Sequence, residues 1–231
     1  MPHQVDHHAI LDRLAATRGG ARNAFAGIDP TRIAHLVIDL QNGFMEPGAP
    51  VEVPEARSIV GNVNRISAAV REAGGLNVFV RFTTPGAGDP AWPVFYERMG
   101  LAADTHRAAF APDAHHWQLW PELDLRAEDA VIDKCRFSAF TPGASGLDAL
   151  LRGLGIDTVI VTGTLTNCCC ESTARDAMQL NYRVLVAADA NAALSDEEHA
   201  ATLQIMAMVF ADLHSTDELV ELLAAPVPAE A

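Results

Sequence analysis

Lysine is almost absent from this chain of 231 residues. It has 16 basic residues, of which Lys134 is the one lysine and all the others are arginine. Lysine differs from arginine because its pKa shifts readily when the side chain is buried, whereas a guanidinium stays charged. The bias therefore has two readings, an accident of codon usage or a position that needs an amine, and composition leaves both open.

Positive charge as a whole is scarce, since the formal net charge is −14 and the isoelectric point is near 4.9. An acidic surface repels phosphate backbones and anionic membranes, so we expect neither nucleic acid nor a membrane as partner. No apolar run reaches the length of a membrane span, and the N-terminus lacks the layout of a signal peptide. With 49% hydrophobic and 20% charged residues, the chain has a globular composition, and we expect it in the cytoplasm.

Cysteine is also rare, and three of the four cysteines are consecutive. Cys135 stands apart from Cys168, Cys169 and Cys170. Adjacent cysteines cannot build a disulfide framework without strained geometry, and a zinc site normally spaces its cysteines by two or more residues. The cysteines are therefore either small buried side chains or include a reactive thiol.

Apolar runs and helical patterns alternate along the chain, which favours a parallel sheet with helices on both faces. We predict an N-terminal arm and helix over 1–30, then one α/β domain over 31–231, three-layered, with a mostly parallel six-stranded sheet. The segment 83–129 is rich in turn formers and aromatic residues and is predicted to be a lid with a short helix near 94–101. Strands are expected at 35–40, 76–82, 130–133, 158–161, 184–187 and 209–213, and helices at 55–73, 146–154, 168–180, 195–208 and 216–223.

Three kinds of reactive side chain follow predicted strands. Asp39 lies at the end of the first strand, Lys134 at the end of the third, and the cysteine cluster follows the fourth at the start of a helix. Ligands of open parallel sheets bind at the carboxyl ends of the strands, so we expect these side chains to meet there. A helix N-terminus and an ammonium would favour a thiolate, and a carboxylate could accept the thiol proton.

Three motifs in this order carry a family resemblance. Residues 37–44 read VIDLQNGF and match D-x-Q-x-x-F, residues 134–140 read KCRFSAF and match K-x-R-[YF]-S-A-F, and residues 162–177 read TGTLTNCCCESTARDA and match T-G-x-x-T-N-x-C-x-E-S-T-A-R-D-A. With them the sequence resembles the isochorismatase-like cysteine hydrolases over about 32–222. The Arg-Phe-Ser-Ala-Phe run is most similar to the ureidoacrylate and N-carbamoylsarcosine amidohydrolases.

The resemblance implies roles for individual residues. It places the nucleophile at Cys169, the general base at Asp39 and an assisting ammonium at Lys134, with Cys168 and Cys170 as packing residues. It also places a cis peptide bond between Thr164 and Leu165, whose N–H would join that of Cys169 in an oxyanion hole. The implied reaction is the hydrolysis of a small amide. It proceeds through a thioester intermediate on Cys169 and needs no cofactor.

The substrate is less constrained by the motifs. Metal-bearing nicotinamidases of the family carry D-x-H after the second strand, whereas this chain reads Phe-Thr-Thr-Pro at 82–85, so no metal is expected; His115 and His116 are read as solvated loop residues. A ureido or carbamoyl compound is favoured. Arg136 either holds a substrate carboxylate or pairs with an acid of the chain. The predicted pocket walls are Gln41, Asn42, Phe44, Trp92 and Phe140.

Other functions remain open at this point. A vinyl-ether hydrolase of the isochorismatase type, a nicotinamidase-like or lactam amidohydrolase, a catalytically silent binding module and a thiol redox sensor share the expected fold. The retained aspartate, lysine and cysteine favour the amide hydrolase, and the redox sensor would use a neighbouring cysteine as its resolving thiol. The resemblance also suggests a homodimer or homotetramer.

Overall fold

The computed structural model describes residues 2–84 and 92–225. Within them, six parallel strands form one sheet in the order β3-β2-β1-β4-β5-β6. This confirms the predicted α/β class. The strands are β1 Ile33–Ile38, β2 Leu76–Phe82, β3 Ala130–Lys134, β4 Thr158–Thr164, β5 Arg183–Ala192 and β6 Asp212–His214.

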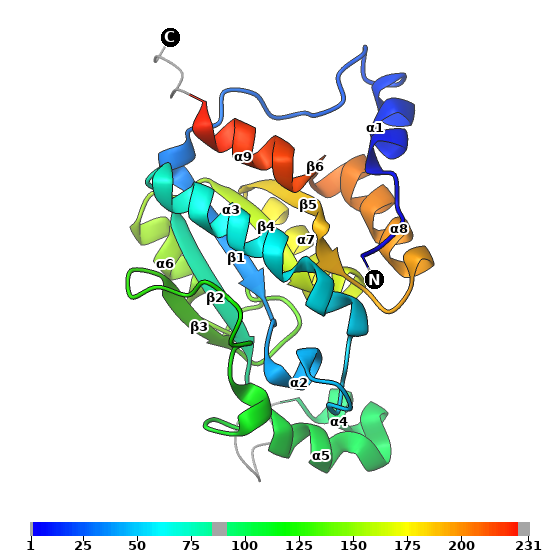
Figure 1. Ribbon diagram of the computed structural model, residues 1–231, viewed down its shortest axis with the longest axis vertical. Helices are drawn as coiled ribbons and strands as arrows, with labels where there is room; N and C mark the ends of the chain where they lie inside the picture. The colour runs from blue at the N-terminus through cyan, green and yellow to red at the C-terminus, as the bar shows by residue number, and fades with distance from the viewer. Residues whose placement is uncertain (1, 85–91, 226–231) are drawn as a thin grey trace.

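Helices cover both faces of this sheet (Figure 1). On one face α1, α6, α7 and α8 bury an apolar cluster that includes Leu147 and Ala174, and on the other α3 and α9 bury a second cluster that includes Val63 and Leu219. The short helices α2, α4 and α5 lie beyond the ends of β1 and β2. The helices are α1 His7–Ala15, α2 Asn42–Met45, α3 Val60–Glu72, α4 Pro93–Met99, α5 Ala103–Ala109, α6 Leu147–Gly153, α7 Glu171–Gln179, α8 Asp196–Ile205 and α9 Thr216–Ala224.

The central strands are buried along their whole length. Every residue of β1 and of β4 is buried, which is the environment that a continuous apolar run indicates in a parallel sheet covered on both faces. Helix starts are set by side-chain caps, because the Ser195 hydroxyl accepts from the Glu198 amide at α8 and Ser215 forms a capping box with Glu218 at α9.

Several predicted bounds differ from the structure, and two of these differences involve π-helical turns. The helix expected at 168–180 starts as a π-helical turn, Thr166–Cys170, before α7. The sixth strand expected at 209–213 is shifted, because Met206–Phe210 continues α8 as another π-helical turn and β6 begins at Asp212. Arg18 stabilises this second turn by donating from Nη2 to the carbonyls of Ala207 and Met208.

The predicted lid forms a small helical layer. Over 92–129 it contains α4, α5 and the 3-10 turns Gly100–Ala102 and His115–Trp117. The helix expected near 94–101 therefore corresponds to α4 and the turn after it. Residues 85–91 of the predicted lid lie outside the described residues. None of the helices described in 2–84 and 92–225 is long and apolar enough to cross a membrane.

The strand order places a crevice between β1 and β4. From β1 the chain proceeds outward through β2 to β3, whereas from β4 it proceeds in the opposite direction through β5 to β6. The connections that leave these two central strands therefore diverge at their carboxyl ends. Ligands of open α/β sheets bind at such a switch point.

Gly163 allows β1 and β4 to meet closely beside this crevice. It pairs with Ile38 in the parallel ladder and has φ +119°, in the region that favours glycine. A Cβ at this position would lie 2.1 Å from the Ile38 carbonyl oxygen and 2.8 Å from its nitrogen. Because both atoms are backbone, no side-chain rotation relieves the overlap, and a larger residue would push apart the strands that carry the crevice.

We expect Gly163→Ala to lower the free energy of unfolding by about 3 kcal/mol or more, since it combines a backbone clash with a positive φ. Chemical denaturation measures this change. Gly61→Ala is the matched control, because Gly61 lies in α3 with open space around its Cβ position, and alanine favours a helix over glycine by about 1 kcal/mol. Equal stability of Gly163→Ala and the unsubstituted protein would show that the strands can separate without cost.

Candidate active site

Asp39 and Lys134 form a fully buried ion pair in the crevice. Lys134 Nζ lies 2.7 Å from Asp39 Oδ2, and neither side chain is exposed. Asp39 follows β1 in a left-handed conformation, with φ +54°, which aspartate tolerates better than most residues. Its amide donates to the Val80 carbonyl of β2, so the turn that aims this carboxylate is held by the neighbouring strand.

Cys169 completes a buried trio, by which we mean Asp39, Lys134 and Cys169. Lys134 Nζ is 3.5 Å from Cys169 Sγ and also donates to the Arg136 carbonyl at 3.1 Å. An ammonium has three N–H donors, and here they serve a carboxylate, a carbonyl and a sulfur. The trio therefore unites residues from the ends of β1 and β3 with the turn after β4, as the sequence predicted for strand ends.

Burial sets the protonation of the trio. It raises the pKa of Asp39 and outweighs the opposing effect of Lys134. Burial alone would lower the pKa of Lys134, but the Asp39 carboxylate and the Cys169 sulfur raise it above the ordinary value. A hydrogen bond to Cys168 and burial raise the pKa of Cys169 well above that of a free thiol. These shifts favour an ammonium at Lys134 and a thiol at Cys169, and they make the Asp39 carboxylate a stronger base.

Backbone hydrogen bonds within the turn hold the position of Cys169. The amides of Cys168 and Cys170 both donate to the Leu165 carbonyl, at 3.1 and 3.2 Å. The peptide bond between Thr164 and Leu165 is cis. Cys169 is 6% exposed, whereas Cys168 is half-buried on the open side of the turn. A hydrogen bond from Cys169 lowers the pKa of Cys168, so the pKa values of the two neighbouring thiols shift in opposite directions.

His199 braces the same turn from α8. Its Nε2 lies 3.0 Å from the Ala188 carbonyl, and its Nδ1 lies 2.9 Å from Thr166 Oγ1. A carbonyl only accepts, so Nε2 carries the proton and Nδ1 accepts from the threonine hydroxyl. Burial lowers the pKa of His199 to about 4, which keeps the ring neutral in this arrangement. The hydrogen bonds join the start of the cysteine turn to the core behind it.

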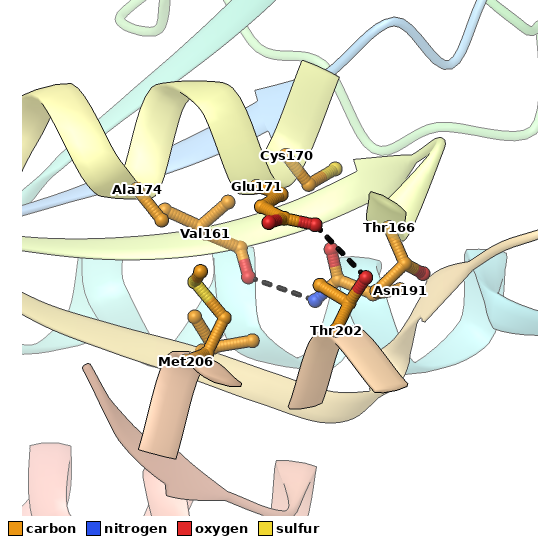
Figure 2. A pocket seen from close by; sticks show the side chains of 9 residues that line it. Val161, Thr166, Cys170, Glu171, Ala174, Asn191, Thr202 and Met206 are labelled. Carbon is orange, nitrogen blue, oxygen red and sulfur yellow. Dashed lines mark hydrogen bonds between the residues drawn. The ribbon is translucent and has the colours of Figure 1, made fainter. Parts of the chain in front are cut away.

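A small cavity of about 10 Å³ lies behind the cysteine turn (Figure 2). Cys170 lines it, and beside it Glu171 accepts a hydrogen bond from the Thr202 hydroxyl of α8 at 2.9 Å. The amide of Asn191 donates to the Val161 carbonyl on the other side. Cys170 therefore lies against the core, in agreement with its predicted packing role.

A larger pocket of about 260 Å³ opens onto Cys169. Its walls come from the turn after β1, from β2, from the lid, from the loop after β3 and from the cysteine turn. Apolar side chains dominate it, and Cys168 lines it beside Cys169. The lining residues are Phe44, Val51, Phe82, Phe95, Met99, His106, Phe137, Leu165, Cys168 and Cys169.

Gln41 and Asn42, predicted as pocket walls, brace the lid instead of lining this pocket. The Gln41 amide donates to the carbonyls of Phe82 and Trp117, and its oxygen accepts from the Phe82 amide at 2.7 Å. Asn42 donates to the His115 carbonyl. Since a side-chain amide can bind backbone on both its donor and acceptor sides, these residues tie the end of β1 to the lid.

The other predicted binding residues have different positions. Phe44 lines the pocket. Phe140 packs against Tyr182 in the core on the far face of the sheet, with ring centroids 5.4 Å apart. Trp92 and Arg136 line a neighbouring groove of about 430 Å³, and among the described lining residues Phe137 alone also lines the pocket at Cys169. The Arg136 guanidinium lies 5.0 Å from the Trp92 ring centroid.

His115 and His116 lie away from the trio. Both approach the Glu46 carboxylate, at 2.9 and 3.6 Å. Within the described part of the chain, the group of side chains that could hold a metal ion is elsewhere, where His7 and His8 of α1 meet Glu218 of α9. The trio has no such group around it in the residues described.

Sequence reasoning missed several pocket residues. Met99 and His106 come from the lid, and Val51 comes from the loop after α2. They belong to none of the three motifs, and the lid has no strand or long helix whose periodicity would show which side chains face the trio. Cys168 was predicted to be a packing residue, yet it lines the pocket. Its position next to Cys169 was the available signal.

Comparisons with known proteins agree with this geometry. The isochorismatase domain matches residues 33–218. The uncharacterised isochorismatase family protein YwoC of Bacillus subtilis is 30% identical over 194 residues, covering 84% of this chain and 95% of YwoC. A cysteine hydrolase from Pseudomonas syringae pv. phaseolicola is similar in structure, with a TM-score of 0.80 and 27% identity over 87% of this chain and 96% of that chain. N-carbamoylsarcosine amidase from Thermoplasma acidophilum gives a TM-score of 0.66 at 27% identity, covering 81% and 98%. The chain belongs to the isochorismatase family and is a hydrolase of that fold.

Proposed function

We propose that this protein hydrolyses the C–N bond of a small amide, with a ureido or carbamoyl compound as the favoured class and Cys169 as nucleophile. The observation that carries the proposal is the convergence of three buried side chains, Asp39, Lys134 and Cys169, of which Cys169 opens onto a pocket. The name of the structurally similar N-carbamoylsarcosine amidase supports the same bond type.

The first half of the reaction forms a thioester. Because the resting thiol is protonated, Asp39 accepts its proton as the sulfur attacks the substrate carbonyl. Asp39 Oδ1 has no hydrogen-bond partner among the described residues, and Oδ2 remains bound to Lys134. The N–H groups of Leu165 and Cys169 donate hydrogen bonds to the carbonyl oxygen and stabilise the negative charge that develops on it. The C–N bond then breaks, and the leaving nitrogen takes the proton from Asp39.

The second half regenerates the thiol. Asp39, again a carboxylate, accepts a proton from a water that attacks the thioester carbonyl. The C–S bond breaks, the acid leaves, and the proton returns to sulfur. Lys134 stays charged throughout and stabilises each anionic form of the trio through fixed donors, which need little reorganisation during the reaction.

The nucleophile is tested by single substitutions. Cys169→Ser is expected to reduce ammonia release from amide and ureido substrates at least ~10³-fold, as removal of a nucleophile does in comparable sites. Cys168→Ser should retain activity within about tenfold because its sulfur makes no bond in the proposed reaction. Cys135→Ser, outside the pocket, serves as a second control. Activity that survives in Cys169→Ser and disappears in Cys168→Ser would move the nucleophile by one residue.

The acid limb of the pH profile tests the base. Catalysis needs Asp39 as a carboxylate, and burial raises its pKa, so kcat/KM should fall with decreasing pH at a midpoint above the usual aspartate value of about 4. Circular dichroism across the same range separates this loss from unfolding. A midpoint at or below 4 in the folded protein would contradict Asp39 as the base.

The same substitutions distinguish the thiol redox alternative. A redox sensor would release no ammonia and would instead show reversible oxidation of Cys169, with Cys168 as the resolving thiol on the neighbouring position. Mass spectrometry after peroxide treatment, followed by thiol reduction, measures that outcome.

A further inference from the structure

We propose that the pocket at Cys169 selects substrates whose group beyond the scissile carbonyl is apolar and uncharged, of branched-alkyl or small aryl size. The inference rests on the proposed function and narrows its substrate class. It also differs from one of the two alternatives that the sequence left open, in which Arg136 holds a substrate carboxylate.

The chemistry of the walls carries the proposal. Phenylalanine side chains from four separate segments line the pocket at Cys169, together with the apolar side chains of three further residues. The phenylalanines are Phe44, Phe82, Phe95 and Phe137, and the others are Leu165, Val51 and Met99. Phe95 and Phe137 contact edge to face, with ring centroids 5.4 Å apart. Such walls favour apolar ligand surface by removing it from water.

The charges near the pocket disfavour an anionic group. Asp39 and Lys134 are fully buried, pair with each other and are not among the lining residues, and all three donors of Lys134 already have partners. Among the described lining residues, His106 is the remaining titratable side chain besides the cysteines. Burial lowers its pKa to about 4, so at neutral pH it has no charge to offer. A carboxylate here would lose its hydration, and the part of the lining that the structure describes holds no cation to compensate it.

The size of the pocket limits the group. A volume of about 260 Å³ lies just below the roughly 300–1,000 Å³ typical of sites for drug-sized ligands. Arg136 lines the adjacent groove and is not among the lining residues of the pocket. A carboxylate bound to Arg136 would therefore lie in that groove, which makes Arg136 the contact to test if the proposal fails.

Two pairs of isosteric substrates test the preference. In each pair an isopropyl group replaces a carboxylate of the same shape: 4-methylpentanamide against succinamate, and isobutylurea against N-carbamoylglycine. Ammonia release at pH 7.5 gives kcat/KM for all four. We expect the isopropyl member to exceed its carboxylate partner at least tenfold in whichever pair is turned over.

A charge substitution tests the location. Met99→Arg puts a cation in the pocket wall and should shift the ratio of kcat/KM toward the carboxylate member at least tenfold. Leu101→Arg is the matched control, because it adds the same charge two residues away on a side chain that is fully exposed and should leave the ratio unchanged.

The outcomes separate this inference from the proposed function. Turnover that favours the carboxylate members, or treats both alike, overturns the inference and leaves the amide hydrolase standing. If no compound releases ammonia, calorimetry with Cys169→Ser gives the affinities directly. Tighter binding of the isopropyl members then supports the apolar selectivity of the pocket but not the proposed amide hydrolysis. Equal, reversed or absent binding overturns both the selectivity and the proposed function.

Discussion

The rest of the site depends on one interaction, the ion pair between Asp39 and Lys134. Two charges removed from water lose several kcal/mol of hydration each, and their attraction compensates this only when the remaining donors and acceptors are also satisfied. Lys134 meets this condition with three partners on three different segments, whereas Asp39 Oδ1 has no partner among the described residues and is the oxygen left for the proposed proton transfer. The pair therefore fixes the end of β1, the loop after β3 and the cysteine turn relative to one another.

This constraint explains the single lysine of the chain. The three acceptors converge on one nitrogen in a space that is closed to solvent, which suits a compact ammonium with three donors. A planar guanidinium is wider and directs its five N–H groups outward in a fork. The protein otherwise uses arginine for positive charge, and the geometry at Lys134 accounts for the one exception. Codon usage alone does not explain why a lysine stands at this position.

Much of the fold and the trio was predictable from the sequence, because both depend on periodicity and on strand ends. Buried parallel strands have continuous apolar runs, and residues at their carboxyl ends meet regardless of the loops between them. The π-helical turn at Cys169 was not predictable, since the same apolar residues fit an ordinary helix. Gln41 and Phe140 lie in recognisable motifs, but a motif does not show whether a side chain faces a substrate, a backbone or the core.

The structure divides chemistry and selectivity between two layers. The sheet supplies the trio, whereas Phe95, Met99 and His106 come from the lid. Gln41 joins the layers, because it directly follows the turn at Asp39 and its amide binds the lid backbone at Trp117. Arg81 of β2 adds a second contact, with its guanidinium 3.6 Å from the Trp117 ring centroid.

A substitution in the lid wall can therefore change which group the pocket accepts. The buried ion pair shares no side chain with that wall and keeps its geometry. The apolar lid and the charged sheet edge also reinforce each other, since walls that exclude water strengthen the fields of Asp39 and Lys134 on the reacting carbonyl.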